Sequence, residues 1–253
     1  MKKLFALLLV ASLFAPLSAS SAEEGYTLDH APNLMNDQAA LQSGAKLFVN
    51  YCLNCHSASS LRYSRLQDLG LTEDQIKKNL LFTSDKVGEL MRVSMTAKDA
   101  KEWFGAAPPD LSVIARAKSG ERGSGADYIY SYLRTYYKDD ARPTGWNNLA
   151  YPNSAMPHIL WQLQGTREAV YVDKKDEAGK PVHEFEKFEE VTPGTLTPLQ
   201  YDRSIAEITG FLSWMAEPAQ ETRKRIGVWV LLFLGATFIL VWRLNASYWK
   251  EVK

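Results

Sequence analysis

The residues with the clearest chemistry are two cysteines and a histidine in the stretch Cys52-Leu53-Asn54-Cys55-His56. This C-x-x-C-H spacing is typical of covalent c-type haem attachment, in which each thiol adds to one haem vinyl group. The adjoining His56 then lies under the iron and can bind it axially. A zinc site needs about four ligands, and the sequence has no second cysteine pair. We therefore predict one covalently bound haem c, with a disulfide between Cys52 and Cys55 as the weaker alternative.

A second axial ligand would make the protein an electron carrier, whereas an open iron face would favour gas binding or peroxide chemistry. The candidates for this ligand are Met35, Met91, Met95, Met156, Met215, His30, His158 and His183. Met156 is the best of them because it precedes Pro157 in a stretch rich in proline and asparagine, which can be held rigid without a helix. A thioether favours ferrous iron and raises the potential. His158 is the main rival.

Two helices are expected to position the haem motif. Apolar residues recur at helical spacing from Ala39 to Cys52, so this helix delivers the motif at its C-terminal end. A second helix opens at Thr197, with a capping box to Gln200 and a proline in its first turn. Its apolar stripe is Ile205, Ile208, Leu212 and Met215. Gly44 has no side chain, and we expect it to mark a close crossing of the two helices.

Shorter elements are predicted between these helices. Thr72 to Gln75 has the form of a capping box and should start a helix. Met91 and Met95 are four residues apart on a possible helix and are expected to fill the core. Asp110 and Asp127 should each cap a helix. The first of these helices would carry Val113, Ile114 and Ala117, and the second Tyr128, Tyr130, Tyr132, Tyr136 and Tyr137.

A small surface β-hairpin is predicted from residues 168–172 and 182–190, which flank the turn residues 176–179. Acidic side chains cluster in this segment and could dock a basic cytochrome c. Lysines are interleaved with them, so we favour a solvated hairpin. Lys and Arg together number 29, as do Asp and Glu, so the chain lacks the basic excess of a nucleic-acid-binding protein.

The N-terminus has the pattern of a secretory signal peptide. Lys2 and Lys3 precede an apolar stretch from Leu4 to Leu17, and small residues follow up to Ala22. We expect cleavage after Ala22, with an uncleaved anchor as the alternative. Export would place a haem domain of residues 23–218 in the periplasm.

A membrane anchor is predicted near the C-terminus. Residues 226–242 are 17 residues without a charge, which span about 26 Å as a helix. This is slightly short of a hydrocarbon core of about 30 Å, and snorkelling of Arg225 and Arg243 can cover the difference. We expect a linker at residues 219–225 and a cytoplasmic tail at residues 243–253, in a single-pass protein of the cell inner membrane. A buried soluble helix is the alternative.

From about Ala39 onward the chain resembles cytochrome c1, the haem subunit of the cytochrome bc1 complex, in its proteobacterial form. The motifs that carry the resemblance are Val49-Asn50-Tyr51-Cys52, Cys55-His56-Ser57, Arg62 to Leu66, Pro108 to Ser112, Ile114 to Ala117, Ala155-Met156-Pro157, Trp214 to Pro218 and Arg223 to Arg225. The resemblance implies a mainly α, class I cytochrome c-like haem domain with extended loops and the small β-hairpin, plus one C-terminal transmembrane helix.

The resemblance also implies roles for individual residues. Met156 would be the sixth iron ligand, Arg116 would lie near a haem propionate, Tyr128 would line the same region and Pro109 would pack against the haem. Two departures concern the rim of the site. His158 follows Met156-Pro157 where many relatives have another proline, and the preceding loop lacks their glycine-rich form.

By the same resemblance, the chain is a redox subunit and no enzyme on its own. It would take electrons from the Rieske iron–sulfur protein after quinol oxidation and pass them to a soluble or tethered cytochrome c. Its anchor would pack beside cytochrome b, in a complex that is dimeric and couples quinol oxidation to proton translocation. Two alternatives stay open. One is a haem enzyme or gas sensor, and the other is a stand-alone tethered cytochrome or monohaem oxidase subunit.

Overall fold

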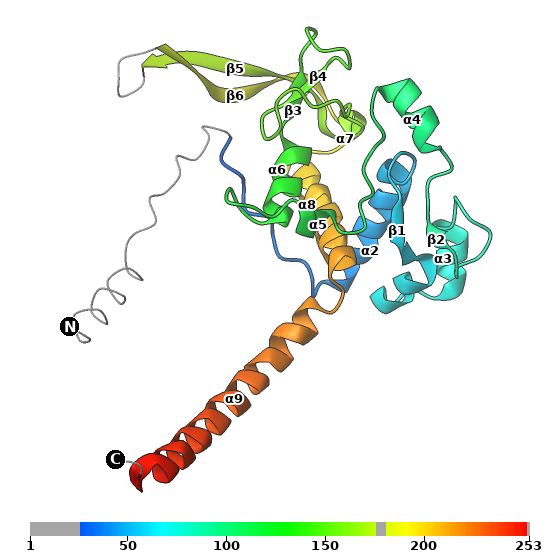
Figure 1. Ribbon diagram of the computed structural model, residues 1–253. Coiled ribbons are helices and arrows are strands. Elements are labelled where there is room, and N and C mark those ends of the chain that lie inside the picture. The colour runs from blue at the N-terminus through cyan, green and yellow to red at the C-terminus, as the bar shows by residue number, and fades with distance from the viewer. Residues whose placement is uncertain (1–25, 176–180, 252–253) are drawn as a thin grey trace.

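The structure, a computed structural model, describes residues 26–175 and 181–251. The expected signal peptide at residues 1–22 and the expected hairpin turn at residues 176–179 lie outside the described residues. Helices make up about half of these described residues. Figure 1 shows a haem-motif domain built on crossing helices, a β-arm at one end and a long C-terminal helix that leaves from the other end.

Two crossing helices form the centre of the domain. Helix α2 (Gln38–Leu47) continues into a π-helical turn, η1 (Phe48–Cys52), and crosses α8 (Pro198–Ala216). A Cβ atom at Gly44 would lie 2.1 Å from the backbone oxygen of Glu207, so the predicted close crossing is confirmed. Phe48 packs against Phe211 beside it, with ring centroids 5.5 Å apart. The crossing sets where η1 ends and therefore where the cysteines lie.

Helix α8 begins as predicted. Thr197 and Gln200 form the capping box, and Pro198 occupies the first turn. The stripe residues Ile205 and Ile208 are fully buried. The helix ends at Ala216, two residues before Pro218, and the chain then enters α9.

Helix α9 (Gln220–Tyr248) is 29 residues long, or about 44 Å. A short 3-10 turn, η3 (Trp249–Glu251), follows it. The helix contains a segment of mean hydropathy 2.0 in which no residue is buried, so it is long and apolar enough to cross a membrane. The expected anchor at residues 226–242 lies within it. Residues 220–225 of the expected linker are helical and form its first turns.

A group of short elements covers one side of the crossing. These are β1 (Ala58–Arg62), the 3-10 helix η2 (Tyr63–Leu69), α3 (Glu73–Asn79), β2 (Leu90–Met91) and α4 (Ala97–Phe104). The predicted capping box of Thr72 and Gln75 starts α3. The possible helix through Met91 and Met95 was wrong, because Met91 pairs with Ala58 in a two-stranded sheet and Thr96 caps α4 only afterwards. Met91 is fully buried, as expected for core filling.

The second group contains α5 (Ile114–Ala117), α6 (Gly125–Arg134), β3 (Tyr136–Lys138), β4 (Trp146–Asn148) and α7 (Trp161–Gln164). Both predicted aspartate caps were wrong. The Asp110 carboxylate accepts backbone N–H groups of Ser59 and Ser112, and Val113 occupies the N-cap position of α5. Asp127 is the third residue of α6, where it completes a capping box with Ser124.

The tyrosine-rich segment is split between a helix and a strand. Tyr136 and Tyr137 were expected in the helix of Tyr128 but lie in β3, which pairs antiparallel with β4. The helix gives way to the strand at Thr135, whose hydroxyl donates to the amide oxygen of Asn148. This side-chain contact and the strand pairing outweigh continued helix formation.

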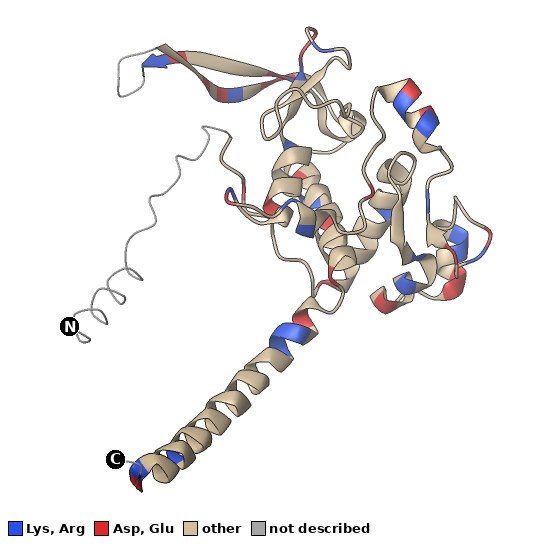
Figure 2. Cartoon of the chain, in the orientation of Figure 1, with Lys and Arg blue, Asp and Glu red and all other residues tan. Residues whose placement is uncertain are grey.

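A long two-stranded arm projects from the end of the domain opposite α9 (Figure 1). Strand β5 (Gly165–Lys175) pairs antiparallel with β6 (Pro181–Pro193) from Gly165↔Pro193 to Lys175↔Pro181. Acidic and basic side chains both occur along the arm, among more numerous uncharged residues (Figure 2), and Lys174 pairs with Glu184 at 2.9 Å. This interleaving favours a solvated surface.

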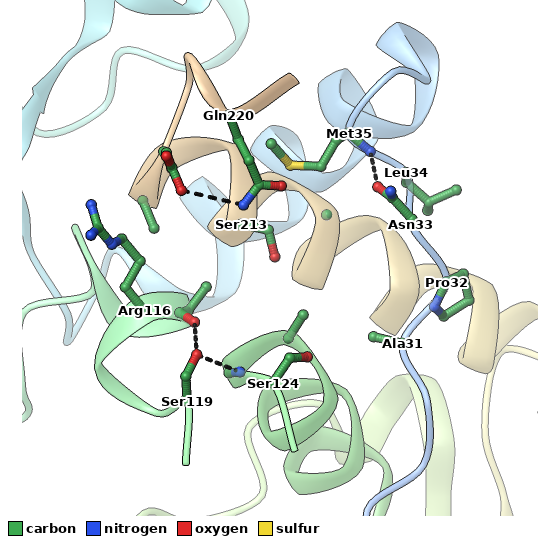
Figure 3. A pocket seen from close by; sticks show the side chains of 16 residues that line it. Ala31, Pro32, Asn33, Leu34, Met35, Arg116, Ser119, Ser124, Ser213 and Gln220 are labelled. Carbon is green, nitrogen blue, oxygen red and sulfur yellow. Dashed lines mark hydrogen bonds between the residues drawn. The ribbon is translucent and has the colours of Figure 1, made fainter. Parts of the chain in front are cut away.

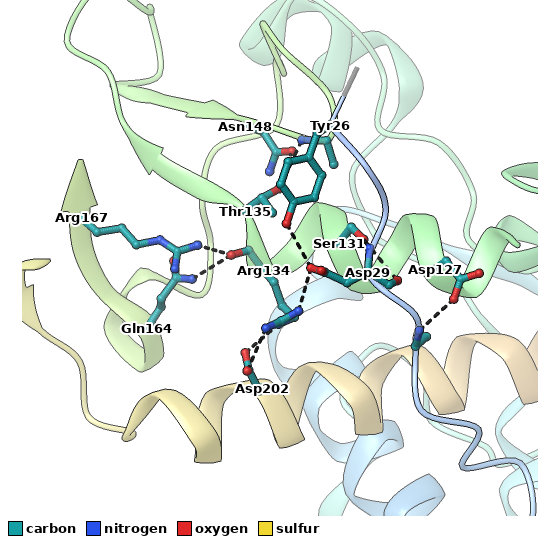
Figure 4. A network of polar contacts seen from close by, with 12 residues as sticks. Tyr26, Asp29, Asp127, Ser131, Arg134, Thr135, Asn148, Gln164, Arg167 and Asp202 are labelled. Atoms are coloured by element: carbon teal, nitrogen blue, oxygen red, sulfur yellow. Dashed lines mark hydrogen bonds and ion pairs between the residues drawn. The ribbon is translucent and has the colours of Figure 1, made fainter. Parts of the chain in front are cut away.

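Two arginines tie the arm and the N-terminal segment to the helices (Figure 4). Arg134 of α6 donates to both carboxylate oxygens of Asp202 on α8, at 2.7 and 2.9 Å, and to Asp29 at 2.8 Å. Arg167 of β5 lies 3.5 Å from the ring centroid of Phe188 and donates to the backbone oxygens of Arg134 and Tyr136. The arm therefore starts from a fixed base.

Candidate haem site

The π-helical turn presents the two thiols and the histidine together. Cys52 is its last residue, and the backbone N–H groups of Cys55 and His56 both donate to the Cys52 oxygen, at 3.1 and 2.8 Å. The chain thus turns sharply, and both thiols are free. Burial, followed by the charge of Cys55, raises the pKa of the Cys52 thiol to about 12. A protonated thiol resists disulfide formation with its neighbour.

His56 is held in one orientation. Its Nδ1 lies 2.7 Å from the backbone oxygen of Pro109, so Nδ1–H donates and Nε2 keeps its free electron pair. Burial lowers the pKa of His56, and this outweighs the opposing effects of the Pro109 oxygen and Asp110. A neutral imidazole with a fixed second nitrogen is the form that binds a metal.

Two adjacent cavities bring the predicted residues together. The larger, of about 300 Å³, includes Cys52, and the smaller, of about 170 Å³, includes Cys55. The residues common to both are His56, Pro109, Ala155 and Met156. The remaining walls are mainly apolar or aromatic, among them Leu111, Ile114, Ile129, Leu133, Ile208 and Leu212 in the larger cavity and Tyr51, Phe104, Pro157 and Ile159 in the smaller.

The loop that carries Met156 is built by polar side chains that sequence reasoning did not assign to it. The amide oxygen of Asn147 accepts the N–H of Asn153, which has a positive φ of 62°. The amide oxygen of Asn148 accepts the N–H of Tyr151. Both asparagines are buried. Their only signal in the sequence was the concentration of asparagine and proline in this region.

Hydroxyl groups hold the main chain of Met156 itself. The Tyr136 hydroxyl donates to the Met156 backbone oxygen at 3.0 Å and lies 2.6 Å from the hydroxyl of Tyr132. Ser154 contacts both Tyr132, at 2.6 Å, and the Met156 oxygen, at 3.4 Å. Met156 is therefore fixed on the cavity wall that it shares with His56.

His158, the rival ligand, faces away from the cavities. It lines neither of them, is 2 % exposed, stacks on Tyr136 and meets the ring of Trp146 edge-on. Burial lowers its pKa to about 3. The geometry favours Met156 over His158 as the partner of His56.

The other predicted residues divide between two places. Tyr128 lines the larger cavity and stacks on Tyr132 with centroids 5.9 Å apart. Lys118 lines it too, with its Nζ 4.9 Å from the Tyr128 ring centroid, and no other charged side chain of the described residues lines either cavity. Sequence reasoning did not assign Lys118 a role.

Arg116 lies elsewhere. It lines a separate pocket of about 520 Å³ between the N-terminal segment, α5 and the junction of α8 with α9 (Figure 3). Glu217 and Gln220 line the same pocket. The structure does not bring Arg116 to the cavities of His56 and Met156.

These residues fit a covalent haem. Two free thiols, a neutral buried imidazole and a thioether converge on cavities with largely apolar walls. Among the described residues, no group of three or more His, Cys, Asp or Glu could hold a metal ion by itself, which leaves the zinc alternative without support. Together with the candidate membrane-spanning helix, the site defines a class: a membrane-anchored c-type cytochrome.

Comparison with known proteins places the chain within that class. Residues 30–252 match the Cytochrome C1 family. The chain is 44% identical over 241 residues to cytochrome c1 from Allochromatium vinosum, which covers 95% of this chain and 96% of that protein. It is 41% identical over 245 residues to a protein named ammonia monooxygenase gamma subunit from Nitrosomonas europaea, with 97% of each chain covered. It is also 26% identical over 244 residues to mitochondrial cytochrome c1 from Saccharomyces cerevisiae, covering 86% of this chain and 68% of that protein.

The chain belongs to the cytochrome c1 family. Proteins of this family bind haem c covalently and act in electron transport. The prediction of one covalent haem c, and of a redox protein that is no enzyme on its own, agrees with this membership.

Proposed function

We propose that this chain is the electron-transfer haem subunit of a cytochrome bc1 complex, which accepts electrons from the Rieske iron–sulfur protein and passes them to a cytochrome c. The observation that carries the proposal is that His56 and Met156 line the same two cavities, each of which also contains one of the two cysteines. When bound, haem supplies a one-electron couple between ferrous and ferric iron. With both His56 and Met156 bound to it, the iron would serve electron transfer rather than substrate chemistry.

The proposed roles follow from position. Cys52 and Cys55 would attach the haem, and His56 and Met156 would bind its iron. Pro109 packs at the wall that both cavities share and orients His56 through its backbone oxygen. Tyr128 lines the larger cavity.

We assign the charge partner of the haem propionates to Lys118 rather than to Arg116. Lys118 lines the larger cavity, whereas Arg116 lines the pocket at the start of α9. An ammonium group near buried carboxylates offsets their negative charge.

The haem domain, residues 23–218, would adopt a class I cytochrome c-like fold on the periplasmic side. The central α2–α8 crossing and the haem motif at the end of η1 support this assignment. The anchor at residues 226–242 would cross the inner membrane once, and residues 243–253 would lie in the cytoplasm. Cleavage of the C-terminal tail by protease added to intact spheroplasts would contradict the orientation.

Cytochrome b is the proposed neighbour of the anchor in a dimeric complex. The apolar surface of α9 is exposed along its whole length, so it is free to pack against lipid or another helix. The deciding experiment is purification of the tagged chain from its own membranes in mild detergent. Copurification of cytochrome b and a Rieske protein, with quinol–cytochrome c reductase activity, is the expected result.

Two other results would contradict the proposal. Recovery of the haem protein alone would indicate a stand-alone tethered cytochrome. Recovery with subunits of an ammonia-oxidising enzyme would instead follow the name of the Nitrosomonas europaea relative.

A further inference from the structure

His158, two residues after the proposed ligand Met156, is held on several sides. Its ring stacks on Tyr136 with centroids 4.8 Å apart and an interplanar angle of 10°. Trp146 meets it edge-on, with centroids 5.0 Å apart. Its backbone oxygen accepts the N–H of Trp161 at the start of α7, at 3.4 Å. A side chain that is 2 % exposed and stacked in this way has little freedom to move.

Tyr136 links this ring to Met156. The tyrosine is fully buried, and its hydroxyl donates to the Met156 backbone oxygen at 3.0 Å. Met156 and His158 are two residues apart, and the same tyrosine contacts one through its hydroxyl and the other through its ring face.

We infer that His158 is a positioning residue for the Met156 ligand: its ring holds Tyr136, and Tyr136 holds the main chain of Met156. The inference rests on the proposed ligation by Met156. His158 itself is no ligand, because it lines neither cavity. Within the described part of the chain the His158 ring makes no hydrogen bond to Tyr136 or to Met156, so its flat face is the part that contacts Tyr136.

Two substitutions of His158, one aliphatic and one aromatic, can distinguish a positioning role from simple filling of the core. His158→Leu fills the space but removes the flat ring, whereas His158→Phe keeps a ring that can stack on Tyr136. His183 provides the matched control, since it stacks on Tyr171 with centroids 5.2 Å apart and an interplanar angle of 8° on the remote arm. His183→Leu removes a stack of similar geometry far from the site, at a side chain that is exposed and also pairs with Asp173.

The test uses the full-length holoprotein in detergent. The readouts are the charge-transfer absorption of methionine-ligated ferric haem, the midpoint potential and CO binding to the ferrous form. We expect His158→Leu to lower the ratio of methionine-ligated to unligated ferric protein about tenfold and to gain CO binding, while His158→Phe and His183→Leu match the native protein. Tyr136→Phe, which removes only the hydroxyl, should weaken ligation in the same direction and serves if His158→Leu fails to retain haem.

Other results would overturn the inference. Native ligation in folded His158→Leu would show that the ring is not needed, and equal loss in His158→Leu and His158→Phe would show that stacking is not the cause. Native ligation in Tyr136→Phe would break the proposed link. Absence of methionine ligation in the unmutated protein would refute the proposed axial pair instead, so the two failures are distinguishable.

Discussion

The Nδ1 of His56 lies 2.7 Å from the backbone oxygen of Pro109, which joins the haem motif to a loop 53 residues further along the chain. The next residue, Asp110, secures that loop. Its carboxylate accepts the backbone N–H groups of Ser59 and Ser112, both at 2.8 Å. The Asp110 carboxylate therefore contributes to the orientation of the imidazole, together with the bond from the Leu111 N–H to the Ser57 oxygen at 2.8 Å.

Asp110→Asn should weaken this loop in a pH-dependent way. Partial burial acts to raise the pKa of the Asp110 carboxyl, but hydrogen bonds from Ser112 and Ser59 outweigh it and hold the pKa below its ordinary value. Because the folded pKa is depressed, the stabilisation is present above the unfolded pKa of about 3.9 and is lost as pH falls through the folded pKa. We expect a loss of about 1 kcal/mol at neutral pH, since Asp110 is exposed and screened by solvent.

The measurement is denaturant unfolding of the native and Asp110→Asn proteins at neutral pH and at pH values down to about 3. The difference between them should shrink as pH falls. Asp68→Asn is the control, because Asp68 is an exposed partner of Arg65 in a surface ion pair. A constant difference at all pH values would contradict the role of the charged carboxylate.

Met156→Leu should lower the midpoint potential and open the iron to CO. A thioether stabilises ferrous iron, and leucine of similar size cannot replace the bond. The expected decrease exceeds the ~59 mV that corresponds to a tenfold change for one electron. Met91→Leu is the control, since Met91 is fully buried but lines neither cavity. An unchanged potential in Met156→Leu, measured by redox titration, would rule out the ligand.

Gly44→Ala should destabilise the domain strongly. Alanine favours a helix by about 1 kcal/mol over glycine, but the added Cβ would meet the Glu207 backbone oxygen at 2.1 Å. The cost of forcing apart two packed helices outweighs the gain in helix propensity, and we expect a net loss of about 3 kcal/mol in the free energy of unfolding. Gly88→Ala, where no atom lies within 4 Å of the new Cβ, should change it by less than about 0.5 kcal/mol. Equal stabilities of the two variants would refute the crossing as the cause.

Local chemistry explains which features could be predicted from the sequence. The capping boxes at Thr72 and Thr197 involve residues three apart, so their geometry is contained in the motif itself. The C-x-x-C-H motif is equally local. The helix crossing at Gly44 could also be predicted, because a glycine inside an amphipathic helix usually has a packing reason.

The sequence predictions were wrong where a contact with a distant part of the chain competes with a local structural preference. Asp110 could cap a helix, but its carboxylate bonds to Ser59, 51 residues away. Tyr136 could extend α6, but its strand pairs with β4. The Tyr136–Met156 and His158–Tyr136 contacts also depend on the folded arrangement of several loops, so no spacing in the sequence indicates them.

Arg116 and Lys118 illustrate the limit of a motif and provide the last prediction. Arg116 is the third residue of the short helix α5 and Lys118 is its C-cap, so a rotation of about 100° per residue leaves their side chains about 160° apart, and only Lys118 lines the haem cavity. Since Lys118 lines it, Lys118→Gln should lower the midpoint potential, because a nearby positive charge favours the reduced haem. The shift should stay below the ~59 mV equivalent to a tenfold change for one electron, since Lys118 is exposed to screening solvent. Both variants are measured by redox titration at low and high salt, and Arg116→Gln should shift the midpoint potential less than Lys118→Gln does. A larger shift in Arg116→Gln would assign the propionate role to Arg116 instead.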